Sequence, residues 1–100
     1  MRKASRELLF EMLQQPTPSG YEGSVSEVWQ RDTARRADRV EVDLHGNAIA
    51  VHNPEGQPRV MLAGHMDPLW FQVVQVSDDG YLYFDTIGGF DLSTVPARPV

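Results

Sequence analysis

The sequence predicts an α/β fold in which two helices are followed by a mixed sheet. Two observations support this: apolar residues recur at helical spacing up to about residue 37, and apolar runs separated by turn residues follow. The chain has 100 residues, of which 41% are hydrophobic and 23% charged. That composition is typical of one small globular domain.

Helical spacing and stop residues define the first part of the chain. One apolar stripe is formed by Leu8, Leu9, Met12 and Leu13. Pro16 and Pro18 should end this helix, because proline has no amide donor and restricts the residue before it. Ser19 and Glu22 have the spacing of a capping box, which predicts a second helix running to about Ala37.

Strands are predicted over most of the remaining chain, at residues 40–44, 48–51, 59–64, 71–76 and 81–84. His45-Gly46-Asn47 and Asp78-Asp79-Gly80 are turn sequences between strand pairs, and the second strongly indicates a hairpin. The segment 59–64 is almost uninterruptedly apolar, which is typical of a central strand covered on both faces.

Charge and cysteine content exclude several classes. The net charge of −5 disfavours a nucleic-acid partner, and the absence of cysteine excludes disulfides and thiolate metal sites. No apolar run approaches the length of a transmembrane helix, so no membrane partner is expected. Glu7 and Glu11 interrupt the segment where a signal peptide would be apolar, and we therefore expect a cytoplasmic location.

The residues that best fit a chemical role are Gly64-His65-Met66-Asp67, at the carboxyl end of the predicted central strand. His65 and Asp67 are two residues apart, so in extended backbone their side chains point to the same side. The imidazole could bind a metal while the carboxylate orients it. A histidine at a strand end is also often only a hydrogen-bonded polar residue, and the spacing leaves both interpretations open. His45 and His52 are interpreted as solvated residues.

An ordered series of segments resembles metallopeptidase family 42, which includes glutamyl, deblocking and tetrahedral aminopeptidases. The segments are Pro18-Ser19-Gly20-Tyr21-Glu22, Val42-Asp43-Leu44-His45-Gly46-Asn47, Val60-Met61-Leu62-Ala63-Gly64-His65-Met66-Asp67, Asp78-Asp79-Gly80-Tyr81-Leu82 and Ile87-Gly88-Gly89-Phe90-Asp91. They cover nearly the whole chain in register. The combination is much more specific than any one segment.

The resemblance implies the phosphorylase/hydrolase-like fold of clan MH. Residues 1–90 would be the N-terminal part of the peptidase catalytic domain, and residues 91–100 would begin the connection to an inserted domain. It also implies a site with two divalent metal ions, zinc or cobalt, that removes N-terminal residues from peptides. His65 would bind one metal, and Asp67 would be the catalytic residue that orients this histidine. A homo-oligomer or self-association is expected.

Departures from the family pattern qualify these expectations. Pro68-Leu69-Trp70 stands where such proteins commonly have Glu-Ile-Gly, which could reshape the pocket. The family's remaining metal ligands lie beyond residue 100, so the site is incomplete and we expect no activity from these residues alone. Two alternatives stay open: a related metal-dependent carboxypeptidase or deacylase, which also uses Gly-His-x-Asp, and a non-catalytic remnant acting as an interaction module.

Overall fold

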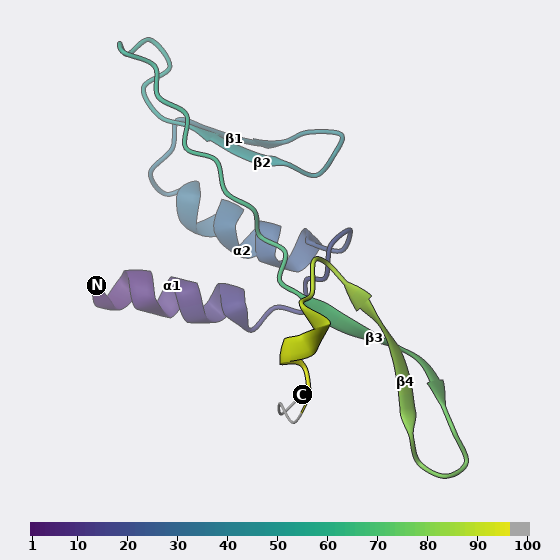
Figure 1. Ribbon diagram of the computed structural model, residues 1–100. Helices are drawn as coiled ribbons and strands as arrows, with labels where there is room; N and C mark the ends of the chain where they lie inside the picture. The colour runs from purple at the N-terminus through teal and green to yellow at the C-terminus, as the bar shows by residue number, and fades with distance from the viewer. Residues whose placement is uncertain (97–100) are drawn as a thin grey trace. The chain divides into compact units, whose positions relative to one another are not determined.

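The computed structural model describes residues 1–96 and confirms an α/β fold with two helices followed by strands (Figure 1). The elements in chain order are α1 (Lys3–Leu13), α2 (Gly23–Thr33), β1 (Arg39–Val42), β2 (Ala48–Val51), β3 (Trp70–Val76), β4 (Leu82–Ile87) and the 3-10 helix η1 (Leu92–Thr94). The chain divides into two compact units, Met1–Asp67 and a second that begins at Pro68.

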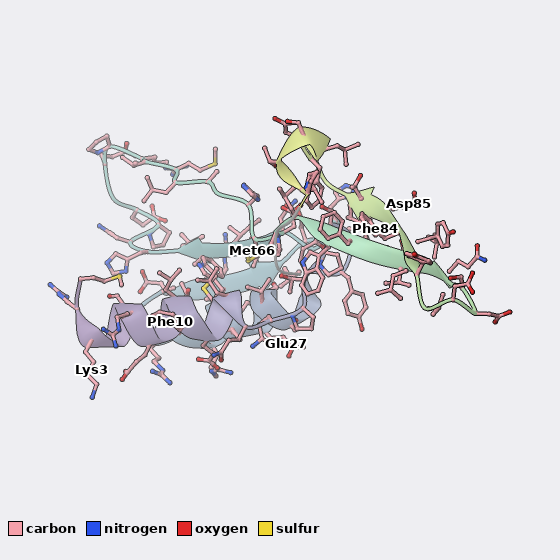
Figure 2. All side chains as sticks on the ribbon, turned by 60° about the horizontal axis from the view of Figure 1, so that its bottom comes forward. Lys3, Phe10, Glu27, Met66, Phe84 and Asp85 are labelled. Carbon is pink, nitrogen blue, oxygen red and sulfur yellow. The ribbon has the colours of Figure 1, made fainter. Side chains whose placement is uncertain are left out.

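Helix α1 forms where the apolar stripe predicted it. Its last turn is closed by the Gln14 N–H, which donates to the Phe10 carbonyl at 3.1 Å. Pro16, two residues later, could not continue the helix. Helix α1 contacts α2. Leu8 and Met12 are half-buried, whereas other side chains of the helix, including Lys3 and Phe10, are exposed (Figure 2).

Helix α2 begins differently from the prediction, because Ser19 and Glu22 do not form a capping box. Glu22 is itself the N-cap residue, and its carboxylate accepts a hydrogen bond from the Gly20 N–H at 2.6 Å. The helix ends at Thr33 rather than near Ala37. The backbone tightens there: the Arg36 N–H donates to the Thr33 carbonyl three residues back, at 2.9 Å.

The core of the first unit lies on the inner face of α2, which contacts α1 and β2. Val25 and Val28 are 2% and 5% exposed. Two polar residues, Thr17 and Ser26, are also buried, and the Ser26 hydroxyl accepts a hydrogen bond from Gln30 Nε2 at 3.0 Å. Because this core is small, the stability of the first unit depends on a few buried side chains.

Strands β1 and β2 form the predicted antiparallel hairpin, with Arg39 opposite Val51 and Val42 opposite Ala48. The turn is organised by Asp43. Its carboxylate accepts from Asn47 Nδ2 at 2.8 Å and from the N–H groups of Asn47 and His45 at 2.9 Å. These bonds, that from the Asn47 side chain above all, hold the pKa of Asp43 below its ordinary value.

The predicted central strand at 59–64 is wrong. This segment is extended but belongs to no strand of residues 1–96, and Val60, Met61 and Leu62 are 77%, 87% and 94% exposed. The prediction of one mixed sheet is also wrong for the described residues, whose strands form two separate antiparallel pairs, β1–β2 and β3–β4. A strand needs a hydrogen-bonded neighbour, and each described strand is paired within its own hairpin.

Strands β3 and β4 form the predicted hairpin of the second unit, with a register irregularity between Val73 and Gln75. Its turn is closed by three hydrogen bonds. The Ser77 N–H donates to the Tyr81 carbonyl at 2.9 Å, the Gly80 N–H donates to the Ser77 carbonyl at 3.0 Å, and the Tyr81 N–H donates to Ser77 Oγ at 3.0 Å. On one face, the Phe71 ring lies 4.6 Å, centroid to centroid, from the rings of both Phe84 and Phe90. These three rings form a small aromatic cluster.

No helix within residues 1–96 combines the length and apolar character needed to cross a bilayer. The predicted connection at 91–100 falls partly on residues 97–100, which lie outside the described residues. The predicted domain boundary at residue 90 stays a prediction.

We predict that Val28→Ala lowers the free energy of unfolding by about 2 kcal/mol, because it removes two buried carbon groups and leaves a cavity. Urea denaturation followed by circular dichroism measures this. Val42→Ala is the matched control, since Val42 is exposed in the same unit. An equal loss in both variants would contradict the assignment of the core to α2.

Candidate functional site

A β-turn before α2 supplies one part of the site. The Tyr21 N–H donates to the Pro18 carbonyl at 2.8 Å, which closes the turn around Ser19 and Gly20. Gly20 has a φ of +89°, the conformation that the third position of a type II turn requires and that side-chain-bearing residues rarely adopt. The turn therefore fixes Ser19 at its second position.

The second part of the site follows the exposed residues 60–62. Here His65 and Asp67 flank Met66, which is labelled in Figure 2. His65 Nδ1 lies 2.9 Å from Asp67 Oδ1 and 3.1 Å from the Asp67 main-chain carbonyl oxygen. The prediction that the two side chains share one side is confirmed. They follow an extended segment, however, and not the end of a central strand.

The partners of His65 Nδ1 determine where the imidazole proton resides. A carboxylate and a carbonyl oxygen can only accept hydrogen bonds, so Nδ1 must carry the hydrogen and donate it. In the neutral ring, Nε2 then keeps its lone pair. The histidine is thereby prepared to bind a ligand through Nε2.

The remaining oxygen of Asp67 has a partner from a distant part of the chain. Asp67 Oδ2 accepts a hydrogen bond from the Ser19 hydroxyl, 48 residues away in sequence. The hydrogen bond from Ser19, followed by that from His65, holds the pKa of Asp67 below its ordinary value, although desolvation acts in the opposite direction. Asp67 is therefore ionised at neutral pH.

The sequence interpretation missed Ser19 as a member of this site, because the spacing to Glu22 had assigned it to a helix cap. The signal that could have found it is Pro18-Ser19-Gly20 itself. Glycine after serine favours a tight turn, and a turn displays the serine hydroxyl away from any helix. Nothing in local spacing relates Ser19 to Asp67.

The exposure of the pair suits a ligand-binding role. The His65 side chain is 87% exposed and that of Asp67 is 31% exposed. The other two histidines lie elsewhere: His45 is in the β1–β2 turn, and His52 follows β2 with its Nδ1 3.6 Å from Asp38. His65 is thus the histidine whose ring is oriented by a carboxylate at hydrogen-bonding distance.

The donor set fits one ligand position of a metal site. Residues 1–96 contain no group of three or more histidine, cysteine or acidic residues that could hold a metal ion. A catalytic zinc site requires about three protein ligands. Within residues 1–96, His65 therefore offers one ligand position and not a complete catalytic metal site.

Comparison with known proteins identifies the family. Residues 46–100, which include His65 and Asp67, match the sequence model of the M42 glutamyl aminopeptidase family. The chain belongs to this family. The resemblance predicted from the sequence is confirmed.

Individual relatives agree with this assignment. The lysyl aminopeptidase of Pyrococcus furiosus is 35% identical over 95 residues, which are 94% of this chain and 27% of that protein. The crystal structure of the TET aminopeptidase from the marine sediment archaeon Thaumarchaeota archaeon SCGC AB-539-E09 is similar, with a TM-score of 0.74 and 34% identity. That match covers 87% of this chain and 24% of the archaeal one. The chain thus spans about a quarter of the length of these two relatives.

Proposed function

We propose that this M42 chain supplies part of the active site of a dinuclear-metal aminopeptidase that removes N-terminal residues from peptides. The observation that carries the proposal is the bond between His65 Nδ1 and Asp67, which leaves Nε2 available. A carboxylate on the far nitrogen of a histidine is the usual arrangement around metal-binding histidines. Family membership and the aminopeptidase relatives support the reaction class.

In this proposal the residues have distinct roles. His65 binds one of two divalent ions, zinc or cobalt, through Nε2. Asp67 keeps the imidazole in the Nδ1–H form and in one orientation. The ions supply Lewis-acid chemistry for peptide hydrolysis when they are bound. A related carboxypeptidase or deacylase is disfavoured, since the matched family and the compared relatives are aminopeptidases.

We predict that these 100 residues alone bind zinc weakly and hydrolyse no aminoacyl substrate. One histidine supplies one ligand, whereas catalysis requires about three. Calorimetric titration with zinc and an assay with aminoacyl p-nitroanilides and added zinc or cobalt provide the two measurements. The expected result is one weak site and no turnover above the buffer.

Matched histidine variants assign the weak site. His65→Ala should abolish zinc binding, and His45→Ala, which removes an exposed histidine without a carboxylate on its ring, should leave it unchanged. Tight binding of two metals per chain, lost in His65→Ala, would contradict the incomplete site. Zinc binding that survives His65→Ala would remove His65 from the proposed mechanism and favour a non-catalytic module.

We also propose that the chain self-associates through its second unit. Exposed apolar residues of the β3–β4 hairpin include Val73, Val76, Tyr81, Leu82, Tyr83 and Phe84. Exposed apolar patches favour association, and each two-stranded sheet has unpaired strand edges that add a second route. The net charge of −5 opposes association, because it makes copies of the chain repel one another.

Sedimentation velocity at micromolar concentration measures whether apolar association or charge repulsion between copies of the chain predominates. We predict species heavier than the 11.3 kDa monomer. Tyr81→Glu should shift the distribution toward monomer, because it places a negative charge among the exposed apolar residues and increases the repulsion between copies. Arg59→Lys, which preserves charge outside the hairpin, is the control. A clean monomer with a cooperative melt would contradict self-association.

A further inference from the structure

We propose that Ser19 is a positioning residue of the metal site. Its hydroxyl holds the Asp67 carboxylate, which in turn holds the His65 ring with Nε2 available for the metal. This inference rests on the proposed function for the role of His65. The Ser19–Asp67–His65 arrangement itself is read from the geometry of the first unit.

The two oxygens of Asp67 have separate partners. Oδ1 accepts from His65 Nδ1 at 2.9 Å, and Oδ2 accepts from the Ser19 hydroxyl. A carboxylate with one partner can still rotate about its Cβ–Cγ bond, because that torsion is broad. A second partner on the other oxygen fixes the carboxylate plane. The direction of His65 therefore depends on Ser19 as well as on Asp67.

Ser19 also joins residues 60–67, the ligand segment that carries His65, to the folded part of the first unit. Within residues 1–96, its bond to Asp67 is the hydrogen bond that connects the segment 60–67 to residues outside it. The segment itself belongs to no described strand. Without the serine hydroxyl, the backbone around His65 would lose this attachment.

The turn that carries Ser19 is a firm base for such an attachment. It is closed by the Tyr21 N–H to Pro18 carbonyl bond at 2.8 Å, and the Gly20 N–H is bonded to the Glu22 carboxylate at 2.6 Å. Thr17, directly before the turn, is 1% exposed and anchors the chain in the core of the unit. The hydroxyl is therefore held in place from both sides of the turn.

Two further variants isolate the hydroxyl from other effects of substitution. Ser19→Ala removes the hydroxyl that donates a hydrogen bond to Asp67, and Ser19→Thr keeps a hydroxyl on Cβ. Ser24→Ala is the matched control, because the Ser24 hydroxyl is buried nearby in sequence but makes no hydrogen bond. Ser19 is exposed, so its replacement should leave the thermal melt of the chain nearly unchanged.

The first readout is the tautomer of His65 in the metal-free chain. Long-range ¹H–¹⁵N spectra, recorded where imidazole is neutral, distinguish the Nδ1–H from the Nε2–H form. In the unsubstituted chain the Nδ1–H form should predominate at His65. Ser19→Ala should shift His65 toward the tautomer ratio of exposed His45, whereas Ser19→Thr and Ser24→Ala should retain the original ratio. An unchanged ratio in Ser19→Ala, or an equal shift in Ser24→Ala, would overturn the proposal.

The second readout is zinc affinity, titrated by the same spectra. Loss of a residue that orients a metal-binding histidine typically weakens binding 10- to 100-fold. Ser19 acts one bond further away, so we expect Ser19→Ala to weaken zinc binding at His65 by roughly 3- to 10-fold. Zinc binding at His65 that is equal in Ser19→Ala and the unsubstituted chain would contradict the positioning role and leave the proposed function intact. Absence of zinc binding at His65 in the unsubstituted chain would contradict the proposed function, and with it the role of Ser19 in metal binding.

Discussion

The candidate site depends on the two hydrogen bonds that the Asp67 carboxylate accepts, one from His65 and one from Ser19. Because an ionised carboxylate can only accept hydrogen bonds, its contact with His65 Nδ1 assigns the ring hydrogen and leaves Nε2 with a lone pair. Its other oxygen accepts from Ser19 and so connects two segments 48 residues apart. Orientation of the histidine, ionisation of the aspartate and attachment of the ligand segment therefore have one common physical origin.

Few buried side chains in the rest of the first unit support these hydrogen bonds. A core of two buried valines holds α2 against α1 and β2, and buried Thr17 brings the chain out of that core directly into the turn that carries Ser19. Only a residue that tolerates positive φ, here Gly20, lets the turn close so tightly. The apolar run before His65 contributes no burial within residues 1–96, so the site relies on specific hydrogen bonds more than on packing.

Local patterns predicted the features that local physics determines. Helix α1 and both hairpins followed from apolar spacing and turn residues, and the two-residue spacing of His65 and Asp67 correctly placed their side chains together. The central strand at 59–64 was predicted wrongly, because strand formation requires a partner that spacing does not specify. Ser19 was missed for a related reason: a nearby capping pattern was visible in the sequence, whereas its bond to Asp67 is not local.

Paramagnetic NMR with substoichiometric Co²⁺ shows which nitrogen of which histidine binds a metal, and we propose that it is Nε2 of His65. The two ring C–H groups, Cε1–H and Cδ2–H, both flank Nε2, whereas Nδ1 is flanked by Cε1–H and Cγ. We expect both ring protons of His65 to broaden together and before those of His45 and His52. Broadening of Cε1–H and the Cβ protons with Cδ2–H spared, or strongest broadening at His45 or His52, would contradict it.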